Sequence, residues 1–315
     1  AAHMIDKYFK PILLGADPRN ISSLLAQIDV PVRGHMCAKS AVDLALHDLA
    51  GKAAGVPVYQ LLGGAMRERA EVCHSVGIAT PEFAAQEAAG TVADGIKTMQ
   101  IKVPGDPETD CAIITDNREA VGDRVDIFPD IIQGYKNTKQ AIAAIRAMQK
   151  FGICGVEQPL EGRRPMARVT EAVDVIVWTD EGVWTPYDAM EVVRQQSADA
   201  ISIYYTKSGG LQRAMEIGVI AATAGMPVNL NGALETGVGN AGNLHLIAAL
   251  RGEVKPNVIP VTTLKGREVC KVGAVFYTDD IITEPFAYAD GFLTIPDKPG
   301  LGIELDMDKI EKYRV

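Results

Sequence analysis

The sequence has no long apolar run and no long basic run. No stretch approaches the roughly 18 consecutive apolar residues that identify a membrane-spanning helix, and residues 1–10 lack the basic and then apolar pattern of a secretory signal. The 31 basic and 40 acidic residues give a net charge of -9, which argues against nucleic acid or an anionic membrane surface as a partner. These absences favour a soluble protein of the cytoplasm.

Cysteine is scarce and scattered. The five cysteines stand far apart without a C-x-x-C pair, at Cys37, Cys73, Cys111, Cys154 and Cys270. An odd number at such spacing indicates free thiols in a reducing compartment, and it argues against a disulfide framework or a zinc site.

The chain does have enough apolar material for a large core. Its 315 residues are 47% hydrophobic, which suits one large α/β barrel or two medium domains. Before residue 70 the pattern is helical, because apolar residues recur at helical spacing over 18–30 and 38–55. Gly55 and Pro57 are typical of the end of the second helix.

From residue 70 onward, short β-prone runs alternate with amphipathic segments. Strands are predicted over 71–76, 98–103, 124–129, 152–157, 175–180, 200–204, 227–231 and 257–261. Helices predicted between them include 81–93, 138–150, 186–195, 210–224 and 241–250. This alternation predicts an α/β fold, a (β/α)8 TIM-like barrel over 70–282 with a partial, mostly helical N-terminal capping domain over 1–69. The segment 283–315 breaks the rhythm, and we expect it to pack back on the cap.

Polar residues fall at the carboxyl ends of successive predicted strands. Lys102, Asp130, Glu157, Asp180 and Tyr204 are 23 to 28 residues apart, each interval corresponding to one βα unit. Catalytic groups in such a barrel come from the ends of several strands at one face. The spacing therefore predicts that one lysine, three carboxylates and one tyrosine surround a single mouth.

Three converging carboxylates would repel one another in a low-dielectric pocket. A hard divalent cation removes that problem, and oxygen ligands suit Mg²⁺, with Mn²⁺ as the alternative. Lys102 beside the cation would have a lowered pKa and serve as a base. Removal of a proton next to a carboxylate needs the developing enediolate to be held by positive charge, which the metal would supply.

Several runs at the strand ends resemble known motifs. They are Gln100-Ile101-Lys102, Asp130, Gly155-Val156-Glu157-Gln158-Pro159, Thr179-Asp180-Glu181 and Lys207-Ser208-Gly209-Gly210. Together they resemble signature runs of the enolase superfamily, in its mandelate racemase and muconate lactonizing enzyme branches. The resemblance covers nearly the whole chain and implies a lyase or isomerase acting on a small carboxylate.

The resemblance implies a role for each matching residue. Asp130, Glu157 and Asp180 match the metal ligands, and Lys102 matches the general base, a pairing known for this superfamily. The expected substrate contacts are Gln100, Asn229, Asn231, Glu235 and Lys207. Gln100 replaces the first lysine of a K-x-K pair, as it does in some relatives that act on proline-like amino acids.

The departures from the pattern bear on mechanism. Tyr204 stands where members with two opposed lysines have the second one, and no histidine follows the 227–231 strand. Ile132 replaces an asparagine that usually follows the first ligand. Tyrosine, with an ordinary pKa of about 10, is a poor base near neutrality. We therefore expect a one-base dehydration or cycloisomerisation, with epimerisation of an amino-acid derivative as the alternative.

For several single residues, a different or purely structural role stays open. Glu181 competes with Asp180 as third ligand, and Lys102 could form a structural ion pair. Tyr204 could be a core residue with a satisfied hydroxyl, and Lys207 is more typical of a structural lysine than of a catalyst. Gly209-Gly210 could cradle a phosphate at a helix start, although close packing explains the pair as well.

Other classes of function also stay open. One is a relative that binds metal or ligand without turnover, since the second lysine and the usual asparagine are missing. Another is a barrel that forms a Schiff base through Lys102, which leaves the three carboxylates unexplained. From the resemblance we also expect a homo-oligomer, a dimer or an octamer, and the absence of a strand-rich N-terminal segment that supplies loops over the substrate.

Overall fold

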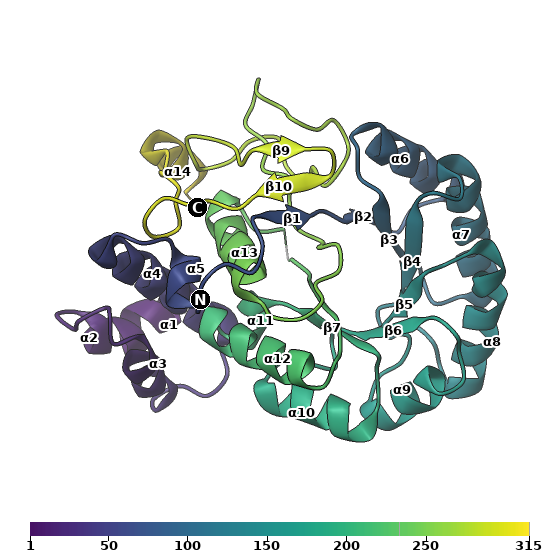
Figure 1. The fold of residues 1–315 in the computed structure, drawn as a ribbon, viewed down its shortest axis with the longest axis horizontal. Helices are drawn as coiled ribbons and strands as arrows, with labels where there is room; N and C mark the ends of the chain where they lie inside the picture. The colour runs from purple at the N-terminus through teal and green to yellow at the C-terminus, as the bar shows by residue number, and fades with distance from the viewer. Residues whose placement is uncertain (233, 315) are drawn as a thin grey trace.

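A computed structural model describes residues 1–232 and 234–314. The apolar runs after residue 70 form a seven-stranded parallel sheet in chain order, curled around the centre of the molecule (Figure 1). Its strands are β2 (His74–Val76), β3 (Thr98–Lys102), β4 (Asp126–Asp130), β5 (Gly155–Glu157), β6 (Ile176–Thr179), β7 (Ala200–Ile203) and β8 (Val228–Leu230). These strands are buried almost throughout, as expected when helices cover a parallel sheet. The predicted TIM-like barrel is confirmed.

The eighth position of the barrel differs from the prediction. The run predicted as a strand over 257–261 makes only isolated bridges, Val72 with Asn257 and Asn231 with Val258. Pro256 and Pro260 flank these two residues and have no backbone N–H to donate, so a longer ladder cannot form here. The two bridges still connect β8 to the chain that enters β2 and close the ring.

The first predicted strand is two separate strands. Only β2 belongs to the barrel, whereas β1 (Arg69–Glu71) pairs with β10 (Phe292–Thr294), which also pairs with β9 (Tyr288–Ala289). This small antiparallel sheet joins the C-terminal segment to the start of the barrel.

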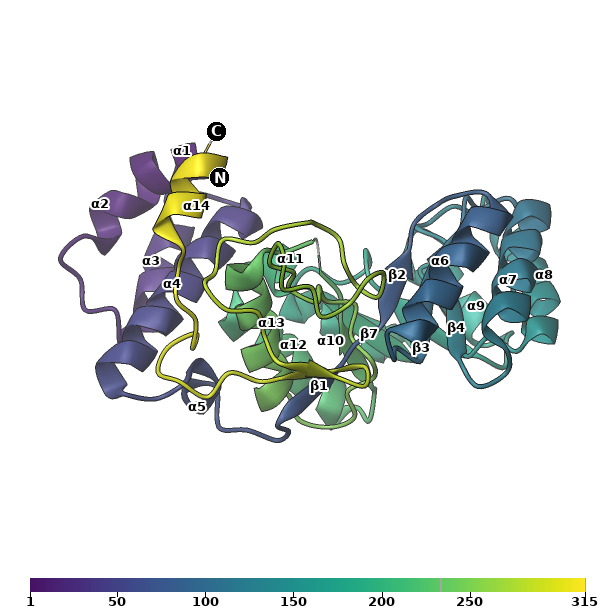
Figure 2. The same ribbon diagram turned by 90° about the horizontal axis from the view of Figure 1, so that it is seen from above.

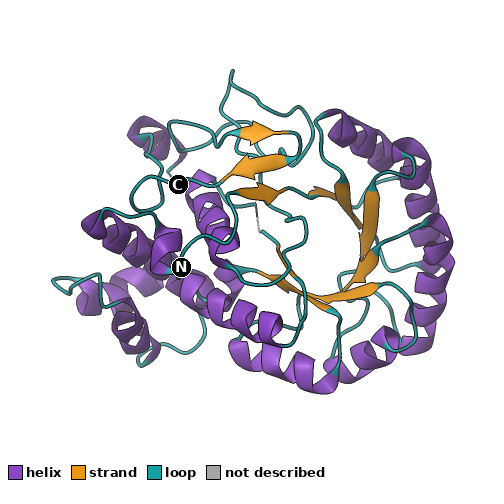
Figure 3. Cartoon of the chain, viewed as in Figure 1, coloured by secondary structure: helices purple, strands orange, loops and turns teal. Residues whose placement is uncertain are grey.

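Helices follow the strands and lie outside them, as Figure 3 shows. They are α6 (Pro81–Ala93), α7 (Pro107–Val121), α8 (Thr138–Met148), α9 (Arg163–Thr170), α10 (Pro186–Gln195), α11 (Tyr205–Ser208), α12 (Leu211–Thr223) and α13 (Gly237–Ala249). Several begin at a residue whose side chain accepts a hydrogen bond from the first-turn backbone, namely Thr80, Asp106, Asn137 and Thr185. The sequence thus specifies where each of these helices starts.

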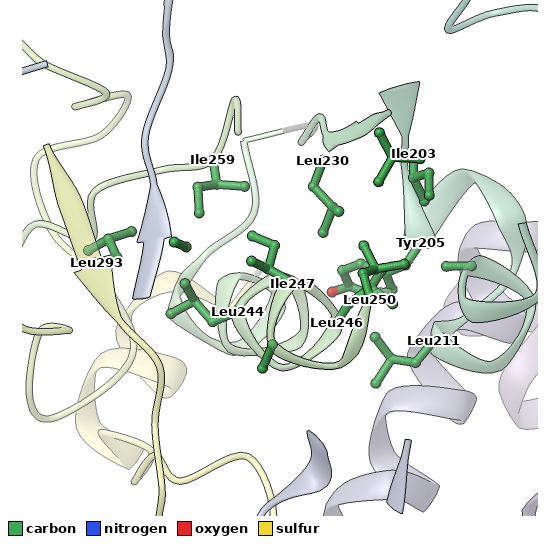
Figure 4. Close-up of a cluster of buried hydrophobic side chains, with 14 of the residues drawn as sticks. Ile203, Tyr205, Leu211, Leu230, Leu244, Leu246, Ile247, Leu250, Ile259 and Leu293 are labelled. Atoms are coloured by element: carbon green, nitrogen blue, oxygen red, sulfur yellow. The ribbon is translucent and has the colours of Figure 1, made fainter. Parts of the chain in front are cut away.

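The core beside β7 and β8 is built around α13, which is buried on every side. Leu230 and Ile259 point toward Ile247 of this helix, while Leu293 of β10 lies on the side of Leu244 (Figure 4). A helix that is apolar all round must be covered on all faces. The barrel, the small sheet and the cap together provide that cover.

The N-terminal helices form a separate layer at one end of the molecule (Figure 2). They are α1 (Ala2–Met4), a π-helical turn (Ile5–Phe9), α2 (Lys10–Leu13), α3 (Ile21–Asp29), α4 (Met36–Ala54) and α5 (Val58–Leu61). They hold an apolar cluster of their own that includes Phe9, Leu24 and Ile28. No helix of the described chain is both long and apolar enough to cross a membrane.

The C-terminal segment returns to these helices before it ends in α14 (Met307–Tyr313). The Leu301 N–H donates to the Asp48 carboxylate of α4 at 2.8 Å, and the Val58 N–H donates to the Gly300 carbonyl at 2.9 Å. The boundaries at 69 and 282 stay predictions.

The N-terminus of α12 also contacts the cap. Asp43 of α4 accepts a hydrogen bond from the Leu211 N–H, and a Cβ on Gly210 would collide with that carboxylate. Gly210 has a φ of 129°, which a side chain would strain. Close packing therefore explains the Gly209-Gly210 pair, because the Asp43 carboxylate already occupies the position at which a phosphate would bind.

Candidate active site

The predicted residues do meet at one end of the barrel. Lys102, Asp130 and Glu157 end β3, β4 and β5, and they are direct partners in the parallel register. Asp180 directly follows β6, and Tyr204 directly follows β7. The one-unit spacing in the sequence thus becomes a row of neighbouring side chains at the carboxyl ends of the strands.

Lys102 and Tyr204 lie on opposite sides of this mouth. The ring has eight positions, seven strands and the 257–258 run, and β3 and β7 are four positions apart. The three predicted ligands occupy the strands between them. Lys102 and Tyr204 both line a cavity of about 400 Å³, a size that suits a small molecule. A larger cavity of about 1180 Å³, between α3, α4 and α12, contains none of the strand-end residues.

Two lysines pair with two of the carboxylates. Lys102 Nζ donates to Asp130 Oδ2 at 2.5 Å, and Lys207 Nζ donates to Asp180 Oδ1 at 2.5 Å and to the Asp180 carbonyl at 2.6 Å. Burial lowers the pKa of Lys102, but Asp130 and the neighbouring carboxylates outweigh it and raise that pKa overall. The protein side chains alone therefore do not give Lys102 the lowered pKa that was predicted for it.

Glu157 is the most buried of the three carboxylates, with no exposed surface. Its Oε2 accepts from Gln100 Nε2 at 2.5 Å, and its Oε1 accepts from Ser202 Oγ and Asn231 Nδ2, each at 2.7 Å. All three donors are neutral. Burial, followed by repulsion from Asp130 and Asp180, raises the pKa of Glu157 well above its ordinary value.

The donor set fits a hard divalent cation. Three carboxylates face two lysine ammonium groups, which leaves one negative charge in excess. Every atom that could ligate a metal here is a carboxylate oxygen. Within residues 1–232 and 234–314, no three His, Cys, Asp or Glu side chains are grouped as they stand to hold an ion. The two ion pairs account for this, since Asp130 and Asp180 are each turned to a lysine.

Tyr204 is placed to donate a proton or a hydrogen bond and not to accept a proton. Burial, together with Asp180, Glu157 and Asp130, raises its pKa far above the ordinary value. Lys207 Nζ lies 5.0 Å from the centre of the Tyr204 ring, a cation–π distance. The hydroxyl therefore stays protonated near neutral pH.

Asp180 and Glu181 lie in different surroundings. Asp180 joins the strand-end carboxylates through its interactions with Lys207, Asp130 and Glu157. Glu181 lines a neighbouring cavity beside Gln158 and Trp184, where burial, followed by repulsion from Asp180, raises its pKa to about 7. These surroundings favour Asp180 as the third ligand.

The predicted substrate contacts are divided. Gln100 lines the cavity and also holds Glu157, whereas Asn229 donates to Asn231 at 3.1 Å and lines a different cavity, beside the first residues of β3 and β4. Lys207 is bound to Asp180, and the Glu235 carbonyl accepts from Tyr277 Oη at 3.0 Å. The substrate-binding roles of these residues stay predictions.

Sequence reasoning missed several residues of the site. Ser202 precedes Tyr204 by two positions, so the two-residue period of a strand places both on the inner face, and this signal could have identified it. Ser75 donates to Gln100 Oε1 at 2.6 Å. It lies between His74 and Val76 on β2, so the same alternation places it on the inner face. Glu87 and Phe276 also line the cavity, although nothing in the sequence pattern singles them out.

Comparison with known proteins gives a consistent picture. Residues 82–309 match the family described as enolase C-terminal domain-like, and residues 1–63 match the mandelate racemase/muconate lactonizing enzyme N-terminal domain. The chain is 32% identical over 314 residues to muconate cycloisomerase 1 of Rhodococcus opacus, covering 98% of this chain and 81% of that protein. It is 34% identical over 307 residues to L-Ala-D/L-Glu epimerase of Clostridium acetobutylicum, covering 95% and 81%.

The structures agree as well. The crystal structure of N-succinyl Arg/Lys racemase from Bacillus cereus matches with a TM-score of 0.88 at 29% identity, covering 98% of this chain and 80% of that chain. The fold, the ordered strand-end residues and both family matches lead to one conclusion. This chain belongs to the enolase superfamily of enzymes, in its mandelate racemase/muconate lactonizing enzyme group.

Proposed function

We propose that this enzyme removes the proton next to the carboxylate of a small carboxylic acid and completes a dehydration or a cycloisomerisation. The substrate would be an acid sugar or an amino-acid derivative. The observation that carries the proposal is the placement of Lys102 and Tyr204 on opposite sides of one cavity, with three carboxylates on the strands between them.

Asp130, Glu157 and Asp180 would hold Mg²⁺, with Mn²⁺ as the alternative. When bound, the ion supplies positive charge that offsets the negative charge developing on the substrate carboxylate. Gln100, Ser202 and Asn231 hold both Glu157 oxygens in place through their hydrogen bonds. Lys102 Nζ then accepts the proton from one side of the substrate.

The opposite side offers an acid rather than a second base. Tyr204 stays protonated because burial and three carboxylates raise its pKa. Its hydroxyl can donate a proton to a leaving hydroxide, which then departs as water, but it cannot remove a proton. One base on one side favours elimination or cycloisomerisation over racemisation.

Epimerisation is the second candidate. Relatives of similar identity include a muconate cycloisomerase, an L-Ala-D/L-Glu epimerase and an N-succinyl-L-Arg/Lys racemase, so similarity alone supports both reactions. The residue opposite Lys102 distinguishes them, since a racemase needs a base on each side.

A deuterium exchange experiment separates these reactions. Amino acids and hydroxy acids are incubated with enzyme and Mg²⁺ in D₂O, and the recovered substrate is examined by NMR and by chiral chromatography. We expect deuterium at the α-carbon with retained configuration, in the wild type and in Tyr204→Phe alike, because Lys102 returns deuterium to the side it deprotonates. Tyr204→Phe should slow product formation while exchange continues. Deuterium in the inverted enantiomer would contradict the one-base mechanism.

A further inference from the structure

A carboxylate outside the predicted ligand set also faces the cavity. Glu87 lies on α6, its side chain is 25% exposed, and it lines the same 400 Å³ space as Lys102 and Tyr204. It pairs with His74, whose Nε2 lies 2.8 Å from Glu87 Oε1. The net charge of this pair therefore depends on the protonation state of the histidine.

The backbone determines this protonation state. The Ala274 N–H donates to His74 Nδ1 at 2.8 Å, so Nδ1 carries a lone pair and not a proton. Nε2 then carries the only ring proton and donates it to Glu87. His74 is neutral in this arrangement, and it orients the carboxylate without cancelling its charge.

The residues around Glu87 fix its position and leave its negative charge available to a ligand. His74 has 1% exposure and stacks on Phe276, with ring centres 5.9 Å apart, which fixes the donor in place. Phe276, Val258 and Pro260 give the cavity an apolar wall. The other charged residue that lines the described cavity is Lys102, which is already paired with Asp130.

We propose that Glu87 binds a cationic nitrogen of the substrate, so that the substrate is a small zwitterion such as an amino acid or an N-alkyl amino acid. The inference rests on the proposed function, which places the substrate carboxylate beside Asp130, Glu157 and Asp180. A fixed anion on a small, partly apolar cavity attracts an ammonium group and repels a second carboxylate. Dicarboxylates and acid sugars are accordingly disfavoured.

The test uses matched acids that differ only in the cationic nitrogen. L-Proline is compared with tetrahydrofuran-2-carboxylate and L-valine with 2-hydroxy-3-methylbutanoate, alongside succinate as a dicarboxylate. The rate of α-proton exchange in D₂O with Mg²⁺ is measured for wild type, Glu87→Gln and Glu82→Gln. The amide oxygen introduced by Glu87→Gln can still accept the His74 hydrogen bond, so the cavity wall is preserved. Glu82 is an exposed carboxylate on the same helix and serves as the control.

We expect wild type to exchange the zwitterions at least about tenfold faster, as kcat/KM, than their oxygen counterparts. Glu87→Gln should remove that preference, mostly by raising KM for the zwitterions, and Glu82→Gln should leave it unchanged. Exchange that favours the oxygen acids or succinate, or an equal effect of Glu87→Gln on both members of a pair, would overturn the inference and leave the proposed function standing. No exchange of any probe by wild type would count against the proposed function itself, and the inference would fail with it.

Discussion

Lys102→Met lowers the rate of α-proton exchange by about 10²- to 10⁴-fold, the contribution of a general base, because Tyr204, the described residue across the cavity, stays protonated and cannot replace it. Methionine matches the length of the lysine stem but cannot accept a proton. Asp130 loses its ion-pair partner in the variant, yet it remains available to a cation. Exchange is followed by NMR with the best substrate found for the wild type.

The control lies beside the same strand. Lys97 is exposed and directly precedes β3, at the end away from Lys102, so Lys97→Met removes the same charge without touching the cavity, and its exchange rate should equal that of wild type. Lys102→Arg guards against a folding defect, since arginine keeps the pair with Asp130 but stays protonated at any accessible pH. Exchange above a tenth of the wild-type rate in folded Lys102→Met or Lys102→Arg would remove Lys102 from the mechanism.

Glu157→Gln abolishes metal binding and, with it, α-proton exchange, without destabilising the metal-free protein. The wild type holds a fully buried carboxylate on three neutral donors, and such an anion is costly to bury. Glutamine has the same shape and no charge, and a flip of the Gln100 amide restores complementary hydrogen bonds. In chelator, the variant should therefore unfold at the same temperature as wild type or higher.

Added Mg²⁺ distinguishes the two proteins. At 100 times the dissociation constant, binding stabilises the wild type by about 2.7 kcal/mol, whereas the thermal midpoint of Glu157→Gln should not move. Glu181→Gln serves as the neighbouring control and should keep the Mg²⁺ response, because Glu181 faces a different cavity. A Mg²⁺ response in Glu157→Gln, or its loss in Glu181→Gln, would contradict the assignment of ligands.

Much of the barrel could be predicted because its strands follow one another in space as they do in sequence. Asp130 and Glu157 were expected side by side from spacing alone, and the register pairs them directly. The final strand was predicted from its apolar residues, but Pro256 and Pro260 limit it to isolated bridges. Propensity indicates where a strand is favoured, and the missing backbone donors decide how far it extends.

The side-chain pairings of the site were harder to predict. Gln100 and Asn231 could be placed on the inner face, but contact with Glu157 or with a substrate depends on distances that the sequence does not encode locally. The position of Glu87 at the cavity depends on the rotation of α6 against β2. The tautomer of its partner His74 depends on the backbone N–H of Ala274, far along the chain. Such long-range contacts are set by packing and leave no periodic signal.

Three carboxylates from consecutive strands are proposed to hold one divalent cation, and anomalous diffraction from crystals grown with Mn²⁺ tests this most directly. The predicted result is a single anomalous peak per chain within ligand distance of Asp130, Glu157 and Asp180, with Lys102 and Lys207 turned away from it. A map without a peak between these side chains, or with its peak elsewhere in the barrel, would contradict the metal-dependent mechanism.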